Sequence, residues 1–218
     1  MKAAVLGATG LTGSILLDYL LADPDYDSVT VFSRRTLSFE HPKLMVHIID
    51  LMDHKSIENL LKGDVVFVNI GTTLKKTPDK ELYFSIDHGI PVNVSRIAKT
   101  NGFKRILVVA SMGADANSTV FYNRTKGQME KDVTDSGPAE AYIFRPSLID
   151  GPRTERRIAE RMGIMIFRIL NLFLWGPLRK YRMIKAEKIS KAMQLVGKNG
   201  YDQSIIESDR IDDIAMGS

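Results

Sequence analysis

Two side chains that can take part in proton transfer stand four positions apart, a phenol at Tyr122 and an ammonium group at Lys126. Residues with this spacing share one face of a helix, so the two groups can act as a pair. A free tyrosine ionises at about pH 10, and a neighbouring cation stabilises its ionised form. The pair is typical of proton transfer to or from a carbonyl or alcohol oxygen. An exposed tyrosine and lysine without any chemical role would have the same spacing, so the surrounding elements must decide.

A hydroxyl group at Ser111 completes the candidate catalytic group. This residue directly follows the apolar run from Ile106 to Ala110, which has the composition of a buried strand. In an open parallel sheet, ligands bind beyond the carboxyl ends of the strands. We therefore expect Ser111 at the ligand-binding edge, where its hydroxyl would hold a substrate oxygen while Tyr122 delivers the proton.

A glycine-rich turn near the amino terminus predicts a dinucleotide site. The sequence Gly7-Ala8-Thr9-Gly10-Leu11-Thr12-Gly13 follows the first expected strand and opens the first expected helix. In this context Gly7 permits a tight turn, Gly10 lets the backbone approach a pyrophosphate, and Gly13 lets the helix pack close to the strand. The free N–H groups at the start of the helix then face the phosphates. The predicted contacts here are Gly7, Thr9, Gly10, Leu11, Thr12 and Gly13.

The residues after the second expected strand select between the two nicotinamide cofactors. About 20 residues beyond the glycine turn, where an NAD enzyme has Asp or Glu, the chain has Ser33-Arg34-Arg35. A hydroxyl and two guanidinium groups suit a 2′-phosphate, because arginine forms bidentate, charge-assisted bonds to phosphate oxygens. We predict NADP(H) rather than NAD; two solvated arginines on a surface loop are the alternative.

Position along the sheet edge indicates further cofactor contacts, with less support from residue type. They are expected directly after the third, fourth and sixth strands. Tyr122 and Lys126 are also expected to contact the nicotinamide ribose. The positional candidates are Asp50, Leu51, Gly71, Thr72, Thr73, Pro146, Ser147 and Leu148.

The elements that must position these groups alternate between short strands and longer helices. Strand-like runs occur at residues 3–7, 28–33, 44–49, 64–70, 105–110, 141–145 and 203–207. Helical periodicity occurs at residues 13–22, 54–62, 82–101 and 122–136. The nearly continuous apolar interiors of the fourth and fifth runs are typical of parallel strands covered on both faces. We predict a doubly wound α/β fold with a mainly parallel sheet and helices on both faces.

The composition fits one globular domain spanning residues 1–218. Hydrophobic residues make up 44% of the chain and charged residues 26%, and the net charge is only +4. The lack of cysteine excludes disulfides, thiolate nucleophiles and Cys-based metal sites, and it favours a reducing compartment. The four histidines lack metal-type spacing, so no metal site is expected. With no recognisable signal peptide, we expect a cytoplasmic protein.

A basic, partly apolar segment follows the last strand–helix unit. Residues 153–191 contain eleven Lys or Arg against three Glu, and residues 162–180 combine an apolar face with flanking cations. A small helical substrate region, a lid or a dimer contact is favoured, while contact with a membrane surface or another partner stays open. The apolar stretch 164–178 is too short and too interrupted for a transmembrane helix. Without a recognition helix or aromatic platform, nucleic acid binding is not expected.

These motifs together resemble the short-chain dehydrogenase/reductase superfamily, in particular its atypical members. The resemblance rests on the glycine turn, Ser33-Arg34-Arg35, Gly71-Thr72-Thr73, the run from Ser111 to Asp115, Tyr122-x-x-x-Lys126-Gly127 and Phe144-Arg145-Pro146. It implies a Rossmann fold, NADP(H) and a catalytic group formed by Ser111, Tyr122 and Lys126. A separation of eleven positions between Ser111 and Tyr122 is tighter than is usual in the family, which puts the substrate chemistry in question.

The sequence leads to an NADP(H)-dependent oxidoreductase that transfers hydride between nicotinamide and a small carbonyl or alcohol substrate, as a monomer or homodimer. The alternative is an NADPH-binding regulatory or redox-sensing protein that acts through protein or membrane-surface contacts with little turnover. Epimerase chemistry with a retained NAD is disfavoured by Ser33-Arg34-Arg35.

Overall fold

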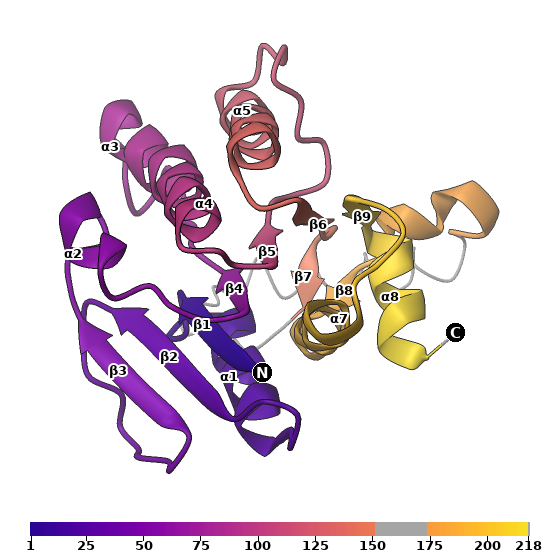
Figure 1. The fold of residues 1–218 in the computed structure, drawn as a ribbon. Coiled ribbons are helices and arrows are strands. Elements are labelled where there is room, and N and C mark those ends of the chain that lie inside the picture. Colours follow the sequence, from indigo (N-terminus) through magenta and orange to yellow (C-terminus); the bar gives the residue numbers. More distant parts are fainter. Residues whose placement is uncertain (151–173, 218) are drawn as a thin grey trace.

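The computed structural model describes residues 1–150 and 174–217, which form a seven-stranded parallel sheet with helices on both faces (Figure 1). The strand order is β3-β2-β1-β4-β5-β6-β9, and every neighbouring pair is parallel. The predicted doubly wound α/β fold is confirmed. The strands are β1 (Lys2–Leu6), β2 (Ser28–Ser33), β3 (Leu44–Ile48), β4 (Val65–Val68), β5 (Arg105–Val109), β6 (Glu140–Arg145) and β9 (Ile205–Glu207).

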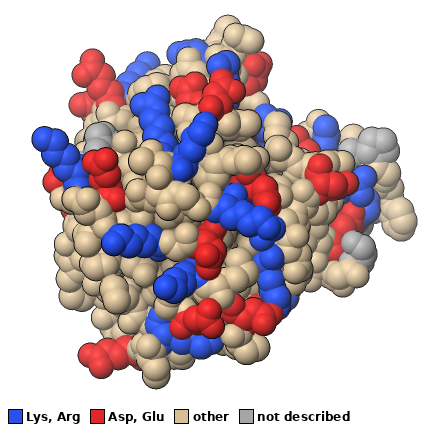
Figure 2. Space-filling view, viewed as in Figure 1, with Lys and Arg blue, Asp and Glu red and all other residues tan. Residues whose placement is uncertain are grey.

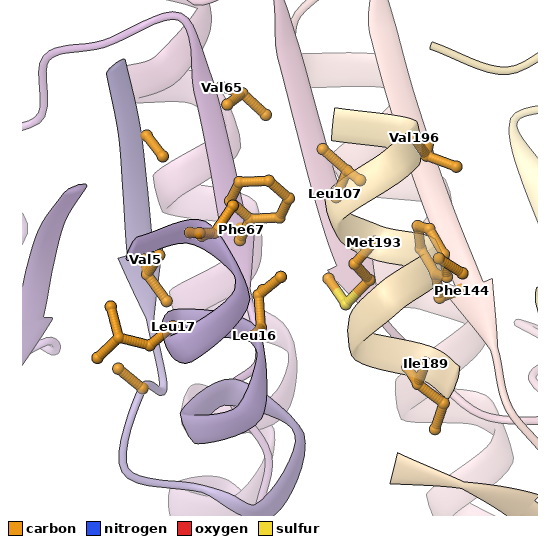
Figure 3. Close-up of a cluster of buried hydrophobic side chains, with 14 of the residues drawn as sticks. Val5, Leu16, Leu17, Val65, Phe67, Leu107, Phe144, Ile189, Met193 and Val196 are labelled. Carbon is orange, nitrogen blue, oxygen red and sulfur yellow. The ribbon is translucent and has the colours of Figure 1, made fainter. Parts of the chain in front are cut away.

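Apolar residues bury both faces of the central strands. All four residues of β4 are buried, and alternate side chains enter the two cores on either side of the sheet. Val65 and Phe67 pack in one core with side chains of α1 (Leu11–Ala22) and α7 (Ala186–Asn199), as Figure 3 shows. Val66 and Val68 pack in the other core, which includes residues of α4 (Ile90–Thr100) and α5 (Phe121–Ser136). This two-sided burial explains the continuous apolar run in the sequence.

The two helices on the first face are far apart in sequence but in direct contact. Ser190 of α7 donates a hydrogen bond to the Thr12 carbonyl of α1 at 2.8 Å. The Gln194 amide donates to the Tyr19 carbonyl at 3.2 Å and to the Asp23 carboxylate at 2.8 Å. Helix α8 (Ser208–Met216) packs against α7. The carboxyl-terminal part of the chain therefore packs against α1, the helix that follows the glycine turn.

The long helix expected at residues 82–101 is present but divided in three. It consists of α3 (Lys80–Phe84), the π-helical turn η1 (Ser85–Gly89) and α4. The Ile90 N–H donates to the Ser85 carbonyl, five residues back, and Pro91 has no N–H to continue an α-helical ladder. The proline therefore accounts for the wide turn. Helix α2 (His54–Glu58) is shorter than the expected 54–62.

Only part of the basic segment 153–191 lies within the described residues, because residues 151–173 fall outside them. Residues 176–181 form the 3-10 helix η3 (Gly176–Tyr181), and β8 (Ile184–Lys185) pairs with β7 (Ile149–Asp150). Residues 186–191 begin α7 and belong to the packed fold. No helix among the described residues is long and apolar enough to span a membrane. Figure 2 shows cations and carboxylates intermixed on the face viewed in Figure 1.

Candidate active site

The glycine turn has the close backbone packing that its sequence predicts. Gly7 has a φ of 85°, and a Cβ atom there would lie 2.4 Å from the Asn69 carbonyl oxygen. A Cβ atom on Gly13 would lie 2.2 Å from the Gly7 carbonyl oxygen, so α1 packs tightly on the turn. Gly10 is the N-cap of α1, and no side chain caps the helix. Among the described residues, the first N–H groups of α1 thus have no side-chain acceptor, which suits an anionic ligand.

The two arginines expected to bind a 2′-phosphate are exposed beyond β2. Ser33 is 8% exposed, and its hydroxyl accepts a hydrogen bond from the Arg35 N–H at 3.2 Å. Within the described part of the chain, neither Arg34 nor Arg35 forms a salt bridge. A pocket of about 350 Å³ lies between the glycine turn and the segment after Arg35, lined by Ala8, Thr9, Ser14, Leu17, Asp18, Thr36, Leu37, Ser38 and Phe39. The pocket therefore begins one residue after the two exposed arginines in the sequence.

Several positional candidates have structural partners of their own. Asp50 is exposed and its side chain accepts from the Met52 N–H at 3.0 Å, while Leu51 is buried in a core. Ser147 donates to the Arg182 carbonyl and accepts from Ser208.

The residues on either side of Ser147 also differ in burial. Pro146 is buried and its carbonyl accepts from the Met112 N–H at 3.0 Å, which ties it to the loop that carries Ser111. Leu148 is 48% exposed. The preceding Arg145 is held by Glu130 and Glu207. Burial raises the pKa of Glu130 although Arg145 opposes the shift, and the network fixes the end of β6.

The loop after β5, which carries Ser111, packs against α5 through its later residues. A Cβ atom on Gly127 would lie 2.1 Å from the Ala116 N–H nitrogen, and the Asp115 N–H donates to the Asn123 carbonyl at 3.1 Å. Asp115 and Ala116, four and five residues after Ser111, are thereby held against the helix that carries Tyr122. The Ser111 hydroxyl is buried, and among the described residues it has no hydrogen-bond partner. Tyr122 is 37% exposed, so its phenol is accessible.

Lys126 lies almost entirely inside the protein, with 5% of its side chain exposed. Its Nζ is 2.8 Å from Oδ1 of Asp87, a carboxylate on η1 with 1% of its side chain exposed. The other carboxylate oxygen accepts from the Thr72 N–H at 2.7 Å. The loop after β4 is further closed by the Thr72 and Thr77 hydroxyls, which are 2.9 Å apart. Thr73 accepts from the Lys76 N–H at 3.3 Å.

Sequence reasoning missed Asp87 and its neighbour Tyr83. The Tyr83 hydroxyl lies 3.5 Å from Oδ1 of Asp87. Burial, followed by the charges of Asp87 and Tyr122, raises the pKa of Tyr83, so this phenol stays protonated. The only signal in the sequence is Pro91, which predicts an irregular turn just before it. In residues 1–150 and 174–217, no cluster of three or more His, Asp or Glu suited to a metal ion is present.

The fold and this edge define a class of protein: a parallel α/β protein with a glycine turn after its first strand, the place where such folds bind a dinucleotide. Residues 7–163 match the family described as NAD(P)H-binding, and the chain belongs to that family. The match confirms the NAD(P)-binding protein that the resemblance implies. The match does not distinguish NADP from NAD.

Fungal relatives correct the expected location of the protein. Protein FMP52 of Candida albicans is 34% identical over 160 residues, covering 71% of this chain and 70% of the relative. Protein fmp52 of Aspergillus niger is 34% identical over 166 residues, covering 73% and 71%. Both are named mitochondrial proteins, which contradicts the expected cytoplasmic location. A lack of cysteine is compatible with any reducing compartment, so it does not distinguish the cytoplasm from another one.

Solved structures share the fold at low sequence identity. The UDP-N-acetylglucosamine 4-epimerase of Methanobrevibacter ruminantium has a TM-score of 0.70 and 21% identity, covering 94% of this chain and 75% of its own. The WbmG enzyme of Bordetella bronchiseptica, solved with NAD, has a TM-score of 0.69 and 14% identity, covering 100% and 77%. A short-chain dehydrogenase/reductase superfamily protein of Agrobacterium tumefaciens with bound NAD has a TM-score of 0.70 and 13% identity, covering 91% and 74%. These likenesses support the Rossmann-type architecture.

Proposed function

We propose that this protein is an NADP(H)-dependent oxidoreductase that interconverts a carbonyl compound and the corresponding alcohol. The observation that carries the proposal is the buried Ser111 hydroxyl, which has no partner among the described residues and lies on a loop packed along the Tyr122 helix. A buried polar group without a partner costs free energy unless a ligand satisfies it. A substrate oxygen is the ligand that suits a hydroxyl beside an accessible phenol.

The residues at the sheet edge fit the cofactor by their chemistry. The N-terminus of α1 offers backbone N–H groups without a side-chain cap, and the tight packing at Gly7 and Gly13 lets the backbone come close to a pyrophosphate. Arg34 and Arg35 are exposed and would hold the 2′-phosphate. The cofactor would supply or accept the hydride.

The chain itself would supply the proton. In carbonyl reduction the Tyr122 phenol donates its proton to the carbonyl oxygen as the alcohol forms, and in alcohol oxidation the phenolate takes it back. Ser111 donates a hydrogen bond that holds this oxygen and stabilises the negative charge that develops on it. Lys126 lies one helical turn from Tyr122 on the same helix and would hold the nicotinamide ribose.

A Tyr122→Phe variant tests the proposal. The wild-type protein is expected to oxidise NADPH only after a carbonyl compound is added, measured by absorbance against a panel of aldehydes and ketones. Loss of the phenol should lower turnover by at least about 100-fold, because general acid catalysis contributes this much. The affinity for NADPH should change little, since the ring that packs in the site is retained.

Tyr19→Phe is the matched control, because it removes a partly exposed phenol from α1 and leaves the Ser–Tyr–Lys group intact. Its turnover should equal that of the wild type. Equal turnover in Tyr122→Phe would refute the catalytic role. Tight NADPH binding without reduction of any carbonyl compound would instead support the regulatory alternative.

A further inference from the structure

Asp87 is a buried charge that the proposed reaction does not use. Its side chain is 1% exposed, and it lies on the π-helical turn η1 at the carboxyl edge of the sheet. An ionised carboxylate without water is costly unless cations and N–H groups replace its hydration. Asp87 has these partners in Lys126 and the Thr72 N–H, which belong to two separate elements of the candidate site.

The ion pair restricts the position of the Lys126 ammonium group. A lysine has a flexible four-carbon side chain and three donors that can rotate. The contact of 2.8 Å to Asp87 occupies one donor, and with 5% of the side chain exposed little water competes for it. Charge-assisted hydrogen bonds between buried groups are short and directional, so the Lys126 ammonium group is held in one position.

The same carboxylate supports the loop after β4. Its second oxygen accepts from the Thr72 N–H at 2.7 Å. A Cβ atom on Gly71 would lie 3.6 Å from Oδ1 of Asp87 and 3.8 Å from Nζ of Lys126. The backbone of Gly71 and Thr72 therefore packs against the ion pair. This backbone lies where a cofactor would cross the sheet edge.

The local sequence places Asp87 for these contacts. Pro91 interrupts the α-helical ladder, and the resulting π turn carries Asp87 and His88. His88 Nε2 is 2.8 Å from Oδ2 of Asp132 on α5, so the turn is fixed to that helix twice. Tyr83 also approaches Asp87, but as a neutral phenol it does not replace the positive charge of Lys126.

We propose that Asp87 is a positioning residue that holds Lys126 and the Gly71–Thr72 turn in the arrangement that receives the nicotinamide half of the cofactor. The inference rests on the proposed function, because it requires that the protein binds NADP(H). Asp87 acts through Lys126 and the backbone of Thr72 and does not itself touch the cofactor.

Two ligands separate this role from a general structural one. NADPH contains both halves of the cofactor, whereas 2′,5′-ADP contains only the adenosine half with its 2′-phosphate. In Asp87→Asn an NH2 donor replaces one of the two carboxylate oxygens, so either Lys126 or the Thr72 N–H loses its acceptor, and the negative charge is lost. We expect Asp87→Asn to weaken NADPH binding about tenfold, the loss of one charge-assisted bond, and to change 2′,5′-ADP binding by less than about twofold.

Asp132→Asn is the matched control, because it makes the same substitution in the other contact that fixes η1 to α5. It should leave the affinities for NADPH and 2′,5′-ADP unchanged.

A Lys126→Gln background supplies a second test. There, adding Asp87→Asn should weaken NADPH binding by less than about threefold, because residues that act as a unit are not additive. The double variant removes both charges of the pair, so its affinities for NADPH and 2′,5′-ADP can be compared with those of the wild type even if either single variant does not fold.

Calorimetric titrations of folded variants, checked by thermal unfolding, distinguish the outcomes. A selective loss of NADPH affinity supports the inference. An equal loss for NADPH and 2′,5′-ADP, or a tenfold loss that persists in the Lys126→Gln background, overturns the inference and leaves the proposed function standing. A wild-type protein that binds neither NADPH nor NADH overturns the proposed function, and the positioning role with it.

Discussion

Replacement of Arg34 and Arg35 by alanine should remove the preference for NADPH without affecting the fold. Both side chains are exposed and form no salt bridge within the described residues, so the free energy of unfolding should change by no more than about 0.5 kcal/mol. At an exposed site, each guanidinium group should contribute about 1 to 1.5 kcal/mol of phosphate binding. Together they amount to about 2 to 3 kcal/mol, or a loss of about 30-fold to 150-fold in NADPH affinity.

Fluorescence titrations with NADPH and NADH, in the wild type and the double variant, measure this effect. NADH lacks the 2′-phosphate, so its affinity should be the same in both proteins. Arg96→Ala with Lys99→Ala is the matched control, because it removes two exposed cations from α4 and changes the net charge equally. Only the Arg34 and Arg35 pair should affect NADPH selectively. Equal losses for the two cofactors, or equal affinities in the wild type, would refute the assignment of the 2′-phosphate site.

Two further predictions concern stability and turnover. Burial raises the pKa of Glu140, but Arg105 and Lys104 outweigh it, so the net pKa lies below the usual 4.5. The ionised form therefore stabilises the fold above about pH 4.5, and this contribution is lost as the pH falls through the lowered pKa. Glu140→Gln should lower the free energy of unfolding by about 1 kcal/mol at pH 7. Chemical denaturation should show a smaller difference between the two proteins at about pH 3.5. Ser111→Ala should lower turnover about 100-fold yet leave the melting temperature unchanged or slightly raised, because its buried hydroxyl has no partner among the described residues. A stability loss parallel to the activity loss would contradict this.

The sequence predicts the fold well because its signals are local. The buried runs around Val65–Val68 and Ile106 need helices on both faces, and this requirement alone indicates a parallel sheet. The glycine turn is equally local, since Gly7 and Gly13 meet within one turn and the start of one helix. The seven expected strands differ from the observed ones by at most two residues at either end.

The interior of the candidate site depends on contacts between distant elements. Asp87 and Lys126 are separated by 39 positions, and no pattern within either segment predicts that they meet. Likewise, Leu51 and Ser147 occupy the expected places along the chain, yet tertiary packing gives the first a core position and the second partners at Arg182 and Ser208. The sequence predicts which loops lie at the sheet edge, but it does not predict which hydrogen bonds and ion pairs their side chains form.

The contact between α1 and α7 has a consequence for the newly made chain. The apolar side of α1, which includes Leu16, Leu17 and Leu20, shares a core with Ile189 and Met193 of α7 (Figure 3). Synthesis from the amino terminus produces α1 more than 160 residues before α7 is available, because the two helices end and begin at residues 22 and 186. At about 5 to 20 residues per second, the side of α1 that packs against α7 lacks this partner for roughly 8 to 30 seconds. A ribosome-bound nascent chain would therefore expose an apolar surface during this interval, and chaperones that recognise apolar segments would bind it then.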